Sequence, residues 1–203
     1  MRGLFVTFEG IDRSGKTTQA RMLCDALGDD ALGVREPGGT EVGERVREIL
    51  KDPAVPLGPE GEALLFAAAR AELVARVIRP ALAEGRVVVS DRFLDSSLAY
   101  QGAARGLGVD EVERVNAFAT SGLRPDITFL LAIDPTAAAA RAGERDRFED
   151  EGLALQEQVL AAYEELAGAD PGRWRRIDAG RAPEEVHADV LAEVETARAG
   201  ARA

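Results

Sequence analysis

Residues 4–27 read LFVTFEGIDRSGKTTQARMLCDAL, and this stretch decides the fold. Leu4 to Phe8 is a short run of strand-forming residues, and Thr17 to Leu27 has the apolar spacing of an amphipathic helix. The loop between them, from Gly10 to Thr17, matches the pattern G-x-x-x-x-G-K-[ST] in the strand-to-helix setting that the pattern requires. We therefore predict a strand, a phosphate-binding loop and a helix in this order.

The residue types of this loop suit an anion. Glycines let the main chain wrap closely round a phosphate, the amide groups and the helix start face it, and Lys16 adds a positive charge. Thr17 offers a hydroxyl to Mg²⁺. The alternative is a chance glycine-rich turn, which random placement would produce in about one such chain per thousand. The triphosphate is expected to contact Gly10, Ile11, Asp12, Arg13, Ser14, Gly15, Lys16, Thr17 and Thr18.

Strands and helices alternate along the rest of the chain. The VVV run at 87–89 is apolar on both faces, which is typical of a central parallel strand buried under helices. Thr40 is expected to cap a helix, and Pro80 is expected to kink one. We predict an α/β fold, with five parallel strands flanked by helices on both faces in a single domain over residues 1–203. The further strands are expected at 31–35, 86–90, 127–133 and 174–177, and the further helices at 41–50, 61–84, 109–121, 135–142, 152–167 and 183–197.

Composition excludes several classes of protein. The chain has 203 residues, of which 46% are hydrophobic, enough for one core and too many for a disordered chain. Its net charge of −11 argues against a nucleic-acid polymer as partner. Cys24 is the single cysteine, so no internal disulfide is possible. Glu9 interrupts the N-terminal apolar run and no apolar run could span a bilayer, so we expect a cytoplasmic protein without a membrane partner.

Four further segments give the chain a specific resemblance. They are REPGGT at 35–40, LLFAAAR at 64–70, DRFLDSSLAYQG at 91–102 and RDRFE at 145–149. In this order, and together with the phosphate loop, they resemble the thymidylate kinase family. The resemblance implies the fold of the P-loop nucleoside monophosphate kinases. It also implies transfer of the γ-phosphate of ATP to dTMP with Mg²⁺, giving dTDP and ADP for thymidine nucleotide synthesis, by an enzyme that is usually a homodimer.

The resemblance assigns a pyrimidine site to the middle of the chain. It implies that Phe66 stacks on the thymine ring and that Arg70, one helical turn later, bonds the O4 edge. Ser97 and Gln101 would lie at the edge of the base, and Tyr100 would lie under the sugar. For each residue a plainer alternative stays open: Phe66 and Tyr100 could belong to the core, and Arg70 could pair with Glu72 or Glu62.

The resemblance also assigns the charged groups at the point of transfer. Asp91 would approach Mg²⁺ together with Thr17, and Arg92 would contact the acceptor phosphate, although the two could be a simple ion pair at a strand end. Asp12 would bond the 3′-hydroxyl group, and Glu36 would lie near the acceptor phosphate. No catalytic histidine or cysteine is needed, because a phosphate monoester is already largely ionised above its second pKa of about 6.

Residues 141–150 resemble the lid of this family. Arg141 would lie against the adenine of ATP, and Arg145 would reach the transferred phosphate. The family places its extra catalytic arginine either in the phosphate loop or in the lid, whereas this chain has arginines in both, so Arg13 and Arg145 are both candidates. Two rival functions stay open, namely a kinase for another nucleoside or nucleotide, and a nucleotide-dependent switch that acts by binding a protein.

Overall fold

The protein is built round one parallel sheet. A computed structural model describes residues 2–141 and 152–202. The strands are β1 (Phe5–Glu9), β2 (Ala31–Arg35), β3 (Val87–Asp91), β4 (Ile127–Ala132) and β5 (Trp174–Asp178), and they lie in the order β2-β3-β1-β4-β5 with every pair parallel. Each lies within one residue of its predicted bounds, so the sequence prediction of the sheet is confirmed.

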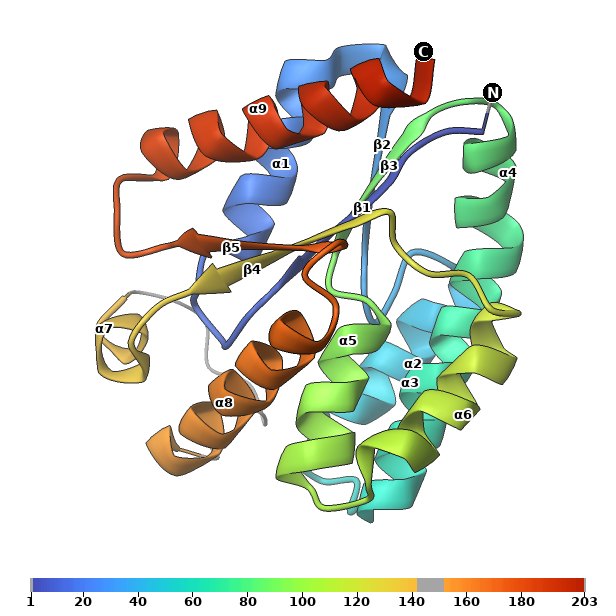
Figure 1. Ribbon diagram of the computed structural model, residues 1–203. Helices are drawn as coiled ribbons and strands as arrows, with labels where there is room; N and C mark the ends of the chain where they lie inside the picture. Colours follow the sequence, from blue (N-terminus) through green and yellow to red (C-terminus); the bar gives the residue numbers. More distant parts are fainter. Residues whose placement is uncertain (1, 142–151, 203) are drawn as a thin grey trace.

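Helices cover both faces of the sheet (Figure 1). Helices α1 (Lys16–Leu27) and α9 (Pro183–Arg202) cover one face, whereas α4 (Arg79–Ala83), α5 (Leu94–Ser97), α6 (Val109–Thr120) and α8 (Leu153–Ala169) lie on the other. Successive residues of β1 serve the two faces: Val6 packs in one core cluster with Leu23 and Val190, and Phe5 packs in another with Ile78. Both faces of the sheet are therefore buried, as expected for parallel strands.

The long predicted helix at 61–84 is interrupted, but not at Pro80. It runs as α3 (Pro59–Leu73), a π-helical turn η2 (Val74–Ile78) and α4. Pro80 lies in the first turn of α4, directly after the widened π turn. A proline removes one backbone donor and its ring crowds the preceding turn, so a wider turn ahead of it relieves both problems. The predicted irregularity is real, but it precedes the proline.

One helical segment was not predicted at all. Residues 94–104 form α5 followed by the π-helical segment η3 (Leu98–Ala104). Residues 94–102 are all buried and include polar side chains such as Asp95, Ser96 and Ser97, so the segment lacks the one-sided apolar periodicity that reveals a helix. The remaining elements are η1 (Gly28–Asp30), α2 (Glu41–Lys51) and α7 (Pro135–Ala139). Thr40 caps α2 as predicted, because its hydroxyl accepts a hydrogen bond of 3.0 Å from the Gly43 amide.

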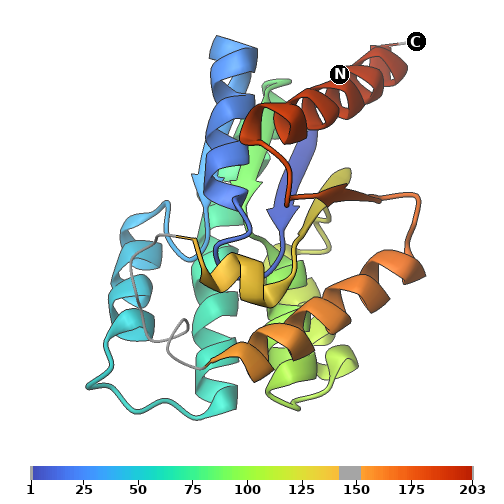
Figure 2. The same cartoon turned by 90° about the vertical axis from the view of Figure 1, so that its left-hand side faces the viewer.

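The carboxyl ends of the three strands β1, β2 and β3 carry the predicted site. Gly10 follows β1, Glu36 follows β2, and Asp91 and Arg92 close β3. In Figure 2 the strand β1 points towards the half of the molecule that holds α3, α7 and α8. Parallel strands deliver such residues to one edge of the sheet, where open α/β folds bind ligands. Within the described residues, no helix combines the length and the apolar character that crossing a bilayer demands.

Candidate active site

The phosphate loop has a backbone that only certain residues allow. Gly10 has φ 141°, and a Cβ atom there would lie 2.8 Å from the Leu131 carbonyl oxygen, so no other residue fits. Gly15 begins α1 with φ 101°. The side chain of Lys16 folds back over the loop, where its Nζ donates to the Ile11 carbonyl oxygen at 2.6 Å. The loop is thus closed on itself with its ammonium group in place.

Lys16 is nearly fully buried, and this changes its chemistry. Burial, reinforced by the positive charge of Arg92, lowers the pKa of Lys16 from 10.5 to about 8. The carboxylates of Asp12, Asp91 and Glu9 oppose that shift. A dianionic phosphate bound in the loop would favour the charged form of Lys16 and so would raise its pKa again.

Two clefts open on either side of this loop. One has a volume of about 530 Å³ and is walled by the phosphate loop, the first turn of α1, Arg141 and the segment from Ala179 to Val186. The other has a volume of about 440 Å³ and is walled by α3, the β3 end and α5 with η3. Arg13, Lys16 and Thr17 line both clefts. Two ligands bound in these clefts would therefore meet at the loop's cation.

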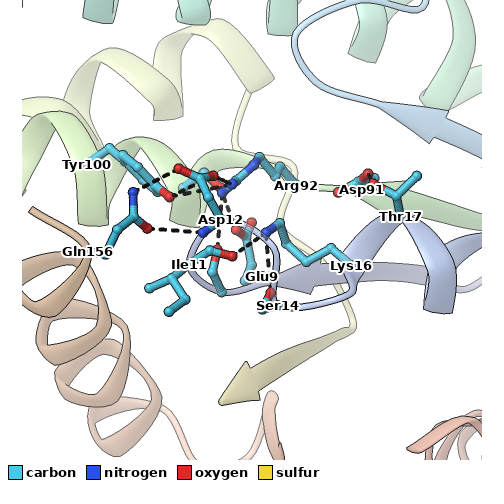
Figure 3. A network of polar contacts seen from close by, with 12 residues as sticks. Glu9, Ile11, Asp12, Ser14, Lys16, Thr17, Asp91, Arg92, Tyr100 and Gln156 are labelled. Carbon is cyan, nitrogen blue, oxygen red and sulfur yellow. Dashed lines mark hydrogen bonds and ion pairs between the residues drawn. The ribbon is translucent and has the colours of Figure 1, made fainter. Parts of the chain in front are cut away.

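Thr17 and Asp91 form a small oxygen site where the clefts meet. The Thr17 hydroxyl donates to Asp91 Oδ2 at 2.5 Å (Figure 3). A hydroxyl and a carboxylate are the hard oxygen ligands that Mg²⁺ prefers, and the ion commonly completes its shell with water and substrate phosphates. The described residues hold no cluster of three or more acidic, histidine or cysteine side chains for a metal cage. The residues present fit a magnesium ion held mainly by phosphates.

Arg92 and Asp12 form the charged centre of the second cleft. Arg92 has φ 72°, a left-handed backbone that is uncommon outside glycine and that marks strain at a functional position. Its guanidinium donates to Asp12 Oδ1 at 2.5 Å and to Ser96 Oγ at 3.1 Å, and it lies 5.2 Å from the centre of the Tyr100 ring. Burial alone would raise the pKa of Asp12, but Arg92 and Lys16 hold it below its ordinary value.

Gln156 on α8 makes two hydrogen bonds to Asp12 (Figure 3). Its Oε1 accepts from the Asp12 amide at 3.0 Å, and its Nε2 donates to Asp12 Oδ2 at 2.8 Å. The Tyr100 hydroxyl donates to Asp12 Oδ1 at 3.2 Å. The Asp12 carboxylate is thereby oriented by groups from β3, η3 and α8.

Beneath this centre lies a fully buried carboxyl group, Glu9 at the end of β1. It accepts hydrogen bonds from the Phe93 amide at 2.8 Å, from Ser96 Oγ at 2.6 Å and from the Tyr163 hydroxyl at 2.9 Å. Burial, and then the negative charge of Asp95, raises the pKa of Glu9 to about 7. Ser96 therefore links Glu9 to Arg92.

Arg70 is locked into the wall of the second cleft, with only 1% of its surface exposed. It donates to Glu36 Oε2 at 2.8 Å, to Ser97 Oγ at 3.0 Å, to the Phe93 carbonyl oxygen at 3.1 Å and to Asn116. Its ion-pair partner is thus Glu36, and not Glu72 or Glu62 as the plainer alternative supposed. All five of its N–H groups have partners within the protein, because Nη2 also lies 2.6 Å from Glu36 Oε2, so a ligand would have to share or replace one of these contacts.

The other predicted base contacts line the same cleft. Phe66 lies at its wall and also packs against the small cluster of Val46, Leu50 and Ala69, so it contributes to the core, and its stacking on a base stays a prediction. Ser97, Tyr100 and Gln101 line it from α5 and η3. The structure therefore brings every predicted acceptor residue to one cleft: Asp12, Glu36, Phe66, Arg70, Arg92, Ser97, Tyr100 and Gln101. Their roles towards a ligand stay predictions.

Comparisons with known proteins give the chain its relatives. A family model described as thymidylate kinase matches residues 8–190. A thymidylate kinase of Desulforudis audaxviator is 52% identical over 89% of this chain and 85% of its own length. Those of Pelotomaculum thermopropionicum and Deinococcus radiodurans are 50% and 46% identical over 94% and 95% of this chain, and 92% and 97% of their own lengths. The chain belongs to the thymidylate kinase family. The match confirms the predicted family, its P-loop α/β fold and its class of enzyme, the kinases.

The structure describes only one of the two candidate catalytic arginines of this thymidylate kinase family member. Arg13, with φ 60°, donates to the carbonyl oxygens of Ala139 and Arg141, each at 3.2 Å. Arg141 returns a bond of 3.1 Å to the Arg13 carbonyl oxygen and donates to that of Ala179 at 2.5 Å. Arg145, and the predicted lid at 141–150 apart from Arg141, lie outside the described residues. Of the two candidates, only the loop arginine Arg13 lies within the described residues.

Several residues of the site were missed by the sequence analysis. Gln156, Glu9 and Tyr163 orient the charged centre, and Asn116 holds Arg70. Arg47 and Lys51 of α2 line the second cleft. Among these residues, only Arg47 and Lys51 could have been found from the sequence, because their spacing places two cations on one helix face. The other four act through contacts between elements that are far apart in the chain.

Proposed function

We propose that the protein transfers the γ-phosphate of ATP to dTMP, with ATP in the larger cleft and dTMP in the smaller one. The observation that carries this proposal is that both clefts end on Arg13, Lys16 and Thr17. A donor and an acceptor bound there would approach each other end to end at a buried ammonium group. Phosphoryl transfer depends mainly on such positioning and on fixed positive charge. We refer below to the donor cleft and the acceptor cleft in this sense.

Each residue at the junction has a task in this proposal. Lys16, together with Arg13 or Arg145, offsets the charge that develops on the transferred group, and Arg92 binds the acceptor phosphate. Because Arg92 is paired with Asp12 in the free protein, binding exchanges part of that ion pair for phosphate contacts. Asp12 then accepts a hydrogen bond from the sugar. The acceptor needs no strong base, since its phosphate is ionised at neutral pH.

Mg²⁺ is part of the proposal, with Thr17 and Asp91 as the residues that would hold it. A bound magnesium ion would neutralise charge on the donor phosphates and fix their geometry. The short hydrogen bond between Thr17 and Asp91 supports this assignment, because it brings two hard oxygen atoms together beside Lys16. Asp91→Asn is expected to raise the Mg²⁺ concentration needed for half-maximal rate. A concentration dependence identical to that of the wild type would contradict the assignment.

The substrate is tested by an acceptor panel in a coupled ADP-release assay. We expect dTMP to be preferred over dUMP, UMP, dCMP and thymidine. The support is a donor at Arg70 for O4 of the base and a ring at Phe66 to stack on it. If UMP, CMP or thymidine reacted faster than dTMP, a kinase for another acceptor would be the better conclusion. A nucleotide-dependent switch would instead hydrolyse ATP at a rate indifferent to dTMP.

Arg13 and Arg145 can be separated by mutation. Arg13→Ala, Arg145→Ala and the double variant would be compared in the same assay. The catalytic arginine should lower turnover by about 10²-fold or more when removed, and the other should lower it little. If neither single change nor the double one altered turnover, charge neutralisation by these arginines would be wrong.

We also propose the state and setting of the enzyme. The whole chain is proposed to act as one domain, with residues 141–150 as a lid, in the cytoplasm and without a nucleic-acid or membrane partner. A homodimer is supported by two large exposed apolar side chains on the neighbouring helices α3 and α6, Leu64 at 57% and Phe118 at 89% exposure. Light scattering should give twice the monomer mass, and Phe118→Glu should halve it.

A further inference from the structure

Glu62 is a buried carboxylate on α3 that reaches the acceptor cleft through another side chain. Its side chain is 2% exposed, and both oxygens are paired. Oε1 accepts from Gln101 Nε2 at 3.0 Å and from Arg105 Nε at 3.2 Å, while Oε2 accepts from Arg105 Nη2 at 3.3 Å. Gln101 lines the acceptor cleft, whereas Glu62 and Arg105 do not.

We propose that Glu62 is a positioning residue that sets which way the Gln101 amide faces, and that it thereby selects a thymine-type base over cytosine. This inference rests on the proposed function. An ionised carboxylate can only accept hydrogen bonds, so the amide must present its NH₂ group to Glu62. Rotation of the amide by a half-turn would place its oxygen against the carboxylate oxygen. The amide oxygen is therefore the atom that Gln101 offers to the cleft.

The base edges explain why this orientation decides the substrate. Thymine offers an acceptor at O4 and a donor at N3–H, whereas cytosine offers a donor at its 4-amino group and an acceptor at N3. The cleft is lined by Arg70, whose guanidinium can only donate, and by Gln101, whose amide oxygen can only accept. Thymine matches both groups and cytosine matches neither. A site whose buried polar groups are left unpaired by the wrong ligand can discriminate by about 10⁴-fold.

Gln101 could not provide this selection without Glu62. A freely rotating amide would turn its NH₂ group towards N3 of cytosine and so accept either base. Arg105 completes the arrangement by holding the Glu62 carboxylate in place. The backbone is fixed as well, because Gly102 packs directly on α6, where an added Cβ atom would lie 3.1 Å from Val109 Cα.

The test compares Glu62→Gln and Glu62→Met with the wild type and with Glu60→Gln, an exposed position on the same helix. In Glu62→Gln the new amide oxygen can serve Arg105 while its NH₂ group faces Gln101, which turns the Gln101 amide round. In Glu62→Met the Gln101 amide is released, and Arg105 remains partly exposed to water. The measured quantity is the ratio of kcat/KM for dTMP to that for dCMP. We expect at least a tenfold fall in both variants and no change in Glu60→Gln.

A modified acceptor reports on the same contact. N3-methyl-dTMP lacks the N3–H donor, so the wild type should use it about 100-fold less well than dTMP, and both Glu62 variants should show a smaller loss. In the wild type itself, the side-chain NH₂ signal of Gln101 should keep its hydrogen-bonded shift when dTMP binds. That nuclear magnetic resonance measurement does not depend on either variant folding.

The outcomes distinguish a failure of the proposed function from a failure of the positioning role of Glu62. If the wild type does not use dTMP, the proposed function fails. If it does, but the Glu62 variants lose dTMP and dCMP activity by the same factor, Glu62 is merely structural and the positioning role is wrong. An unchanged penalty for N3-methyl-dTMP in the variants, or a Gln101 NH₂ signal that moves to a free position with dTMP, would also overturn it.

Discussion

The two clefts that meet at Lys16 are built in different ways. In the donor cleft, Arg13 and Arg141 bond main-chain carbonyl oxygens, and Arg181 is exposed. In the acceptor cleft, Arg70 is buried and bonds three other side chains. Main-chain groups and cations suit a triphosphate group, which all nucleoside triphosphates share. A wall of side chains that hold one another by hydrogen bonds is suited to recognising one particular base. We therefore expect the acceptor cleft to be the more selective of the two.

The largest expected effect comes from breaking the buried ion pair between Arg70 and Glu36 in the wall of the acceptor cleft. Arg70→Met leaves Glu36 buried without its cation, and burial already raises the pKa of Glu36 even with Arg70 present. Breaking a buried ion pair in this way costs about 3–5 kcal/mol of unfolding free energy, measured by urea denaturation. Adding Glu36→Met should restore part of the loss. Equal stability of Arg70→Met and the wild type would contradict the interlocked wall.

The next effect tests the junction of the clefts. Lys16→Ala removes the fixed cation and should lower turnover by about 10²–10³-fold, because a charge aimed at a developing anion is worth about 3–4 kcal/mol in a site closed to water. Melting temperature serves as the control, since folding should survive. Turnover near that of the wild type would exclude the phosphate-loop role.

The buried carboxyl group below Arg92 gives a pH-dependent effect. The pKa of Glu9 is raised from 4.5 to about 7 in the folded protein, so its contribution to stability is present below pH 4.5 and is lost as the pH rises through 7. Between pH 4.5 and 8 the wild type should therefore lose roughly 2–3 kcal/mol more unfolding free energy than Glu9→Gln, which cannot ionise. Parallel pH profiles of the two proteins would contradict this.

A smaller effect concerns the aromatic wall of the acceptor cleft. Stacking of a base on an aromatic ring is worth about 1–3 kcal/mol, so Phe66→Ala should raise KM for dTMP by about tenfold or more and change KM for ATP little. Phe66→Leu keeps the packing against Val46 and Leu50 but loses the ring. If Leu behaved like Phe, the residue would serve only the core.

The smallest effect belongs to the donor cleft. Arg181 is exposed and pairs with Asp189, and exposed pairs contribute less than about 1 kcal/mol. Arg181→Ala should change KM for ATP by less than about threefold, as judged by ATP titration at saturating dTMP. A loss as large as that for Phe66→Ala would erase the contrast between the clefts.

The sequence predicted most of the fold, and the reasons are local. Strands such as β3 are continuous apolar runs, and the glycine pattern of residues 10–17 fixes the loop between β1 and α1. The helical segment at 94–104 was not predicted because it is buried on every side and several of its buried residues are polar, which leaves no one-sided apolar pattern. Asp95, for example, is fully buried against Arg173, a partner 78 residues away that no local pattern can reveal.

The candidate site divides in the same way. The residues within motifs, such as Lys16, Arg70 and Gln101, were predictable because the motifs carry them. Glu62 and Gln156 were not, since their importance comes from which neighbour they touch. Glu62 was weighed only as a partner for Arg70, whereas the folded chain pairs it with Arg105 and Gln101.

The two hydrogen bonds between Gln156 and Asp12 have a practical use. One glutamine ties the outer helix α8 to both the backbone and the carboxylate of a residue in the phosphate loop. Glu157, its neighbour, is exposed. A fluorescent dye attached through a cysteine introduced at 157 would sit one residue from that tie. Its emission would then report occupancy of the acceptor cleft in real time, which would make the protein a nucleotide sensor without altering either cleft.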